Sequence, residues 1–197
     1  MGEADSRRRP GRPATIDAEQ IVDAAVSVID ESGIEACTMR AVADRLGVTP
    51  MSIYRHITDK ADLLGRIPES LLGPVAADVV RKRRALTALG AVADGLGDVL
   101  ESHPNLAPLF HQPTPGPAMM RAAAHCVELL IAEGCPPQDA FELLRALVAL
   151  VVGQAVTTHG ARSDFGTRLF LIGAASLLTT SPSGRSLAGT GSATVGH

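Results

Sequence analysis

The sequence predicts an all-α fold of about nine helices. Ala, Leu and Val dominate a hydrophobic fraction of 46%, and aromatic residues make up 3% of the 197 residues. Such a composition favours helices over sheets, and long alternating β-branched runs are few. Apolar residues also recur at the helical period between recognisable start and stop residues. The length and hydrophobicity indicate one or two domains with a substantial core and exclude global disorder.

Residues 1–14 are predicted to form a flexible basic arm. Two prolines and a glycine within Arg7–Pro13 prevent a helix. Arg7, Arg8, Arg9 and Arg12 fall within six residues. Two interpretations remain open: a solvated, disordered N-terminus, or an arm that contacts DNA phosphates or enters a minor groove.

The first helix is predicted from Asp17 to Gly33. Asp17 is a favourable N-cap, Gln20 completes a capping box, and Ile16 and Ile21 occupy the hydrophobic-staple positions. Apolar residues then follow one face of a 3.6-residue period. Gly33 can adopt the left-handed conformation that ends a helix.

Two short helices joined by a tight turn are predicted next. The first covers residues 38–46, and Gly47 turns the chain sharply. The second opens with Thr49 as N-cap and Pro50 at the first helical position, and it closes near Ile57. Ile53 is its expected core residue. The positions left for its exposed face are Met51, Ser52, Tyr54 (the single tyrosine of the chain), Arg55 and His56.

A fourth helix begins at residues 58–60, and Pro68 is expected to kink or break it. Gly73-Pro74 predicts a further break, so we expect a domain boundary in this region. The remaining helices are predicted at residues 79–102, 105–111, 117–133, 136–159 and 164–178. The helix at 136–159 is apolar nearly all round, which indicates burial on more than one side. Residues 181–197 are predicted to be a disordered tail.

Several functional classes are disfavoured. No run approaches ~18 consecutive apolar residues, so we expect no membrane-spanning helix, and the polar start without an apolar signal region predicts a cytoplasmic protein. Three cysteines without CxxC spacing, and scattered histidines, predict neither a metal site nor a cofactor. We find no GxSxG, HExxH or P-loop pattern, so no enzyme is expected.

The charge pattern does not indicate a basic nucleic-acid coat. The net charge is −3, and residues 1–60 hold eight Lys/Arg against ten Asp/Glu. Cations nevertheless cluster locally, in the N-terminal arm and at Arg40, Arg45, Arg55 and Lys60. Local clustering of this kind is compatible with DNA binding although the domain as a whole is acidic.

Five short runs carry a family resemblance: Gly33-Ile34-Glu35, Thr38–Ala43, Leu46-Gly47-Val48, Ile53–Ile57 and Lys60–Leu64. With these runs, residues 17–64 resemble the N-terminal domain of the tetracycline-repressor (TetR/AcrR) family of transcriptional regulators. The resemblance covers about a quarter of the chain. It implies a three-helix, helix-turn-helix DNA-binding domain at residues 15–64 and a helical ligand-binding and dimerisation domain at 65–180.

The resemblance also implies that residues 49–57 enter the major groove of an operator. The expected DNA contacts are Thr38, Arg40, Thr49, Pro50, Met51, Ser52, Tyr54, Arg55, His56 and Lys60. Less specific interpretations stay open: the Tyr54 ring could pack in the small domain, and His56 could be a surface residue favoured by the helix dipole. Arg45 is expected to be solvated.

By the same resemblance, the helices at 136–159 and 164–178 would pair with a second copy as a four-helix bundle, and a small, mostly apolar effector would bind within the larger domain. The expected pocket residues are Leu109, Phe110, His111, Met119, Met120, Ala123, Val127, Leu147, Val151 and Gln154. Ala76 stands where the founding member carries a histidine that holds a metal-chelated drug, so the resemblance does not extend to tetracycline-like recognition.

The leading hypothesis is therefore a ligand-responsive transcriptional regulator, a repressor that binds a pseudo-palindromic operator as a homodimer and is released by a small, mostly apolar effector. The alternative is a helical protein-interaction module that retains the motif without specific DNA binding, which the acidic net charge would suit. A salt titration separates them, because affinity falls steeply with salt when phosphates are neutralised.

Overall fold

The computed structural model describes residues 16–111, 116–158 and 164–180. The basic arm at 1–14 and the tail at 181–197 lie outside them. Within the described ranges all regular structure is helical, as predicted. In chain order the elements are α1 (Ala18–Ser32), the 3₁₀ turn η1 (Ile34–Ala36), α2 (Met39–Leu46), α3 (Pro50–Ile53), α4 (Lys60–Val79), α5 (Ala85–Ser102), the 3₁₀ segment η2 (Pro104–His111), α6 (Pro117–Ala132), α7 (Pro137–Thr157) and α8 (Asp164–Thr180).

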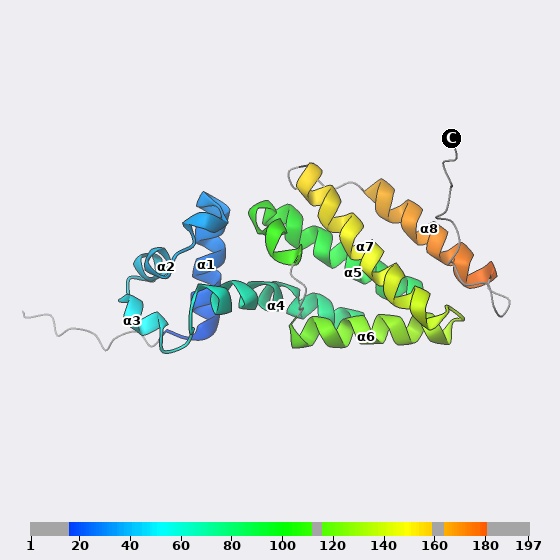
Figure 1. Cartoon of the computed structure of the whole chain (residues 1–197), viewed down its shortest axis with the longest axis horizontal. Coiled ribbons are helices and arrows are strands. Elements are labelled where there is room, and N and C mark those ends of the chain that lie inside the picture. The colour runs from blue at the N-terminus through cyan, green and yellow to red at the C-terminus, as the bar shows by residue number, and fades with distance from the viewer. Residues whose placement is uncertain (1–15, 112–115, 159–163, 181–197) are drawn as a thin grey trace, which may run out of the picture.

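The molecule is elongated, with the elements grouped at its two ends (Figure 1). Helices α1–α3 gather at one end, α5–α8 occupy the other, and α4 runs from the first group into the second. Each group has its own apolar interior. We call the buried cluster around Ile21, Ile29, Val42 and Ile53 the N-terminal core, and the one around Leu89, Leu100, Leu130 and Leu147 the C-terminal core.

Helix α1 forms as the sequence predicts. The Asp17 carboxylate accepts from the backbone N–H of Gln20 at 2.9 Å, and the Gln20 side chain accepts in return from the N–H of Asp17 at 3.1 Å. At the other end Gly33 has a φ of +81°, and its N–H donates to the carbonyl of Ile29. Both ends of the helix are therefore fixed by local hydrogen bonds.

Helix α4 does not break at Pro68 or at Gly73-Pro74, contrary to the prediction. Both prolines lie inside a continuous helix from Lys60 to Val79. Pro68 cannot donate to the carbonyl one turn earlier, but apolar side chains on either side of it are buried. Leu63 and Ile67 belong to the N-terminal core, and Leu72 belongs to the C-terminal core. Tertiary packing at both ends thus outweighs the local preference for a break.

Two other boundaries differ from the prediction. The third helix ends at Ile53, because the N–H of His56 bonds to the carbonyl of Ile53 at 2.9 Å in a tighter turn that leads to the buried Ile57. The helix expected from residue 79 begins at Ala85, after a turn in which the N–H of Lys82 bonds to the carbonyl of Val79. The Glu133 carboxylate then accepts from the N–H of Ala85 at 2.9 Å and caps α5 from a distant part of the chain.

The segment η2 contributes to both cores. Leu106 and Leu109 are buried in the N-terminal core, whereas Ala107 is buried in the C-terminal core. The Asn105 side chain donates to the carbonyls of Ile29 and Asp30, both at 3.1 Å, at the C-terminal end of α1. A segment distant in sequence therefore closes the interior around α1.

Candidate nucleic-acid interface

A tight turn sets the angle between α2 and α3. The Thr38 hydroxyl accepts from the N–H of Ala41 at 3.1 Å and caps the start of α2. Gly47 ends that helix with a φ of +66°, in the left-handed region, and the N–H of Val48 then bonds to the carbonyl of Ala43 at 3.0 Å. Glycine suits this position because other residues pay a steric cost there. The hydroxyl oxygen expected to contact DNA at Thr38 thus already accepts a bond within the helix.

Helix α3 turns one side to the interior and the other to solvent. Ile53 is fully buried, and Ile57 follows it into the N-terminal core. Met51 is 71% exposed and Tyr54 49% exposed, and Thr49, Pro50, Arg55 and His56 are also exposed. Ser52 is half-buried, with its hydroxyl 3.2 Å from that of Thr49. The structure brings these side chains together on one outward surface, which we call the α3 surface.

The positively charged side chains near the α3 surface differ in their ion pairs and in their exposure. Arg40 lies 3.8 Å from the carboxylate of Asp44 one turn later, and its side chain is 86% exposed. Arg45 bonds with both guanidinium amines to Glu31 on α1, and this hydrogen bond lowers the pKa of the Glu31 carboxyl. Arg45 is thus an exposed residue, as the sequence predicted, and its ion pair with Glu31 joins α2 to α1.

Lys60 and Arg55 form a contrasting pair. Lys60 is half-buried, and its Nζ donates to the carbonyl oxygen of Ile34 at 3.3 Å. Arg55 is exposed, and its guanidinium has no hydrogen bond or ion pair with any residue that the structure describes. Lys60 uses one of its three N–H donors on a neutral carbonyl, so both residues keep a positive charge that could meet an external anion.

The start of α4, just after the α3 surface, is strongly capped. The Asp59 carboxylate accepts from the N–H of Asp62, and the Asp62 carboxylate accepts from the N–H of Thr58, both at 2.8 Å. Arg66 also donates to Asp62 at 2.7 Å. These bonds, chiefly the one from Arg66, hold the pKa of Asp62 below its usual value. The turn between α3 and α4 is therefore fixed in place.

The residues expected to line an effector pocket do not share one environment. Leu109 is buried in the N-terminal core, and Phe110 is half-buried against both cores. Leu147 and Val151 are buried in the C-terminal core, Met119, Ala123, Val127 and Gln154 are half-buried in its helices, and Met120 is 51% exposed. The His111 side chain lies outside the described residues. Leu109 differs most from the expected pocket position, because it is buried in the N-terminal core together with residues of α1.

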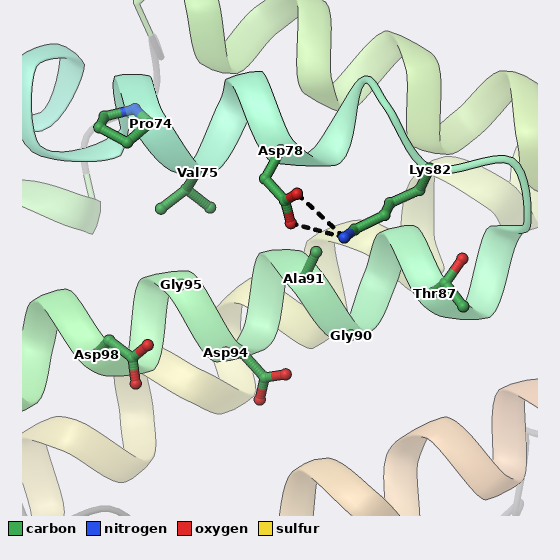
Figure 2. Close-up of a pocket in the computed structure, with 10 residues that line it drawn as sticks. All are labelled: Pro74, Val75, Asp78, Lys82, Thr87, Gly90, Ala91, Asp94, Gly95 and Asp98. Carbon is green, nitrogen blue, oxygen red and sulfur yellow. Dashed lines mark hydrogen bonds and ion pairs between the residues drawn. The ribbon is translucent and has the colours of Figure 1, made fainter.

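A surface groove of about 650 Å³ lies between α4 and α5 (Figure 2). Its lining comprises Pro74, Val75, Asp78, Lys82, Thr87, Gly90, Ala91, Asp94, Gly95 and Asp98, none of which was expected in a pocket. Asp78 and Lys82 point toward each other and form an ion pair of 2.8 Å (Figure 2). A Cβ at Gly95 would lie 2.5 Å from Cγ1 of Val75, so the helices approach closely there. Sequence periodicity could not reveal this groove, because it depends on how α4 and α5 pair.

Helices α7 and α8 present large apolar side chains to solvent. The exposed ones are Phe141, Val156, Phe165, Leu169, Ile172 and Leu177, and we call this surface the α7–α8 apolar face. By length and composition alone, helix α7 could cross a membrane. The lengths of the uninterrupted apolar runs predicted no such helix. It nevertheless packs against α5, α6 and α8, and Leu144, Leu147 and Val152 are buried among them.

The part of the chain that the structure describes holds no group of three His, Cys, Asp or Glu residues placed to bind a metal. All three cysteines are buried. Burial raises the pKa of the Cys126 thiol to about 11, so this thiol is protonated near neutral pH. These cysteines behave as small apolar core residues.

Comparisons with known proteins agree with this architecture. Residues 21–67 match the model of the family described as bacterial regulatory proteins, tetR family. The repressor DrrR1 of Streptomyces coeruleorubidus is 42% identical over 62 residues, a match that spans 30% of this chain but 23% of DrrR1. The family-model match covers α1 to α3 and the first part of α4.

Solved structures extend the similarity to most of the chain. A TetR variant from Acinetobacter baumannii AYE, in complex with minocycline, has a TM-score of 0.68 and 25% identity over 83% of this chain and 95% of its own. BioQ bound to its natural double-stranded DNA operator has a TM-score of 0.61 and 26% identity over 82% of this chain and 99% of its own. The fold is therefore shared with both structures over 82–83% of this chain.

Proposed function

Since this chain belongs to the tetR family of bacterial regulatory proteins, we propose that it is a homodimeric repressor that binds a pseudo-palindromic operator and is released by a small, mostly apolar effector. At the coarser level it is a DNA-binding transcriptional regulator, in keeping with its named relatives and with the BioQ–operator complex. Its relatives are regulators and not enzymes, and we assign it no reaction.

The α3 surface is the observation that carries this proposal. Its outward side chains are of the kinds that read DNA: Pro50 and Met51 can contact thymine methyl groups, and Ser52 can bond to a base or a phosphate. Tyr54 and His56 can bond to phosphates. Arg40, which belongs to α2 and not to this surface, can make a bidentate contact with a guanine. Ile53 and Ile57, buried behind them, hold the surface rigid.

Dimerisation would explain the α7–α8 apolar face. Six large apolar side chains are exposed on two helices that pack together, and soluble monomers rarely leave large apolar patches uncovered. A two-fold pairing of these helices would bury the patch and present two α3 surfaces. Operator half-sites would then lie about one DNA turn apart, roughly 34–36 Å or a multiple of it.

We place the effector in the helices of the proposed larger domain, residues 65–180, and the DNA contacts in residues 15–64. The minocycline complex of a TetR relative supports a small-molecule ligand in general. Ala76, buried in the C-terminal core here, offers no side chain to coordinate a metal-chelated drug. An apolar effector therefore fits these helices better than a tetracycline does.

Selection of bound sequences from a random duplex pool tests the proposal. The wild-type chain should enrich a pseudo-palindrome, with an affinity that falls steeply as salt rises. Met51→Ala should weaken binding by roughly tenfold or more and relax the preference at one base pair, as the loss of a base contact does. Met120→Ala is the matched control, since it truncates an exposed methionine on α6.

The interaction-module alternative predicts a different result. In that case no duplex would be enriched, binding to DNA would be absent at low salt, and Met51→Ala would have no measurable effect. Enrichment of a sequence without two-fold symmetry would contradict the homodimer while leaving DNA binding in place.

A further inference from the structure

Glu69, on α4, caps the start of another helix. Helix α6 begins beside the middle of α4 (Figure 1), and its own N-cap residue, Gly116, makes no side-chain hydrogen bond. Instead, Oε1 of Glu69 accepts the N–H of Ala118 at 2.8 Å. The helix dipole favours a carboxylate at this end of a helix. We call this contact the α4–α6 cap.

The Glu69 carboxylate fits closely against the start of α6. A Cβ placed on Gly116 would overlap Oε2 of Glu69 and would lie 2.7 Å from its Cδ. The φ of Gly116 is −65°, which any residue can adopt, so glycine is needed here for space and not for conformation. Oε2 itself is buried and has no hydrogen-bond partner among the described residues. An unpaired buried oxygen costs stability, so this contact is not one that stability alone favours.

The α4–α6 cap lies at the boundary between the two cores. Ile67 is buried in the N-terminal core and Leu72 in the C-terminal core, so Glu69 belongs to the turn of α4 that joins them. Pro68, just before it, has no N–H, and α4 therefore lacks one backbone hydrogen bond at this boundary. The α4–α6 cap thus fastens α4 to the C-terminal helices where α4 has lost a bond of its own.

The direction of α4 at this boundary determines where the α3 surface lies. Leu63 and Ile67, in the first part of α4, pack in the same core as Ile53 behind the α3 surface. In a two-fold dimer, two such surfaces must meet one operator at a fixed separation. If α4 pivots at Pro68, only a fraction of the molecules holds this separation, and the apparent Kd rises by the inverse of that fraction.

On these observations, and resting on the DNA binding and the dimer proposed above, we propose that Glu69 is a positioning residue for operator binding. Its α4–α6 cap fixes the direction of α4 and so the separation of the two α3 surfaces. Glu69 itself lies on the part of α4 that packs against α6. A change at the start of α6 should therefore alter operator affinity, although none of the expected DNA contacts lies in α6.

Glu69→Ala and Gly116→Ala test this role by breaking the α4–α6 cap from its two sides. The probe is the duplex enriched from the random pool, titrated with the full-length chain well below the unfolding temperature. Each variant should raise Kd by roughly tenfold, as a fall of the competent fraction to a tenth does. Glu69→Ala removes a negative charge, which by itself would favour DNA binding, so a weaker affinity cannot come from the charge. The slope of log affinity against log salt should stay that of wild type, because no phosphate contact is lost.

A double variant and two further variants separate positioning from other effects. In the Glu69→Ala background, Gly116→Ala should raise Kd no further, because its Cβ then has space. Glu69→Gln keeps an oxygen for the Ala118 N–H and should keep most of the affinity. Glu128→Ala, which removes an exposed glutamate from α6, should bind as wild type does. An unchanged Kd for Glu69→Ala would overturn the positioning role, and so would a changed salt slope.

A measurement on the wild-type chain covers the case in which the variants do not fold. If the α4–α6 cap favours operator binding, linkage requires that the operator favours the cap. Hydrogen exchange at the Ala118 amide should therefore slow when the duplex is added, relative to the Ile131 amide at the other end of α6. Equal changes at the two amides would overturn the positioning role. Failure of the wild-type chain to bind any duplex would instead contradict the proposed function, and urea unfolding of the Glu69→Ala and Gly116→Ala cycle would still decide whether Glu69 caps α6.

Discussion

The conformation of Gly47 determines how α2 and α3 meet. Its φ of +66° is unfavourable for a side chain, although nothing lies within 4 Å of the place a Cβ would take. Gly47→Ala should therefore lower the free energy of unfolding by about 1–2 kcal/mol through backbone strain alone. Urea unfolding measures this difference.

Gly65→Ala is the matched control for that substitution. Gly65 lies inside α4 with similarly open space around it and an ordinary helical backbone. The alanine should raise stability there by about 0.5–1 kcal/mol. Equal effects at the two glycines would show that the left-handed turn is not needed.

Single residues were predictable where their role is local. The cap at Asp17, the stop at Gly33 and the turn at Gly47 follow from side-chain chemistry and from the conformational freedom of glycine. The ion pair of Arg45 with Glu31 and the bond from Lys60 to Ile34 were not predictable, because each joins residues brought together by the packing of two helices.

At the scale of the element, the N-terminus of α4 should make stability depend on pH. Hydrogen bonds from Arg66 and from the Thr58 N–H lower the pKa of Asp62 in the folded chain below the unfolded value of 3.8. The unfolded chain therefore binds this proton first as pH falls. The stabilisation is fully present above pH 3.8 and is lost as pH falls through the folded pKa.

Asp62→Asn tests this dependence by urea unfolding at pH 6 and at pH 3. The variant should be less stable than wild type at pH 6, and the difference should shrink at pH 3. Arg66→Met removes the largest cause of the shift and should reproduce the same trend. A difference that is constant across this range would exclude Asp62 as the source.

Elements were predicted well where the apolar period and the caps agree, as in α1 and α2. They were predicted poorly where packing overrides a local signal. Pro68 and Pro74 favour breaks, yet the residues around them are buried in two cores and keep α4 continuous. The start of α5 was misplaced because Glu133, far along the chain, supplies its cap.

For the molecule as a whole, the α7–α8 apolar face predicts a dimer. One charged side chain introduced into that face should disrupt it. Leu169 is 59% exposed on this face. Leu169→Asp should raise the dimer Kd by at least about 100-fold, because an interface cannot bury an unpaired carboxylate cheaply. Sedimentation and light scattering measure the mass, and operator affinity should fall with it.

Val80→Asp is the control for this prediction. Val80 is 41% exposed in the turn between α4 and α5 and is not one of the residues of the α7–α8 apolar face. This variant should keep the wild-type mass. A dimer that survives Leu169→Asp would place the interface elsewhere.

Features of the whole molecule were the least predictable from the sequence. The fold class and the α3 surface could be predicted, because a helix-turn-helix is a local arrangement whose buried and exposed positions follow one period. The groove between α4 and α5 and the place of Leu109 could not, since both depend on which helices pack together.

The two-sided packing of η2 has a practical consequence for engineering. A chimera that exchanges only the first 67 residues would separate Ile21 and Ile29 from Leu106 and Leu109, which fill the same interior. It would also lose the amide of Asn105 from the end of α1. A DNA-binding domain moved to another regulator therefore needs residues 103–110 moved with it. The recipient protein must accommodate a segment whose side chains pack in both cores.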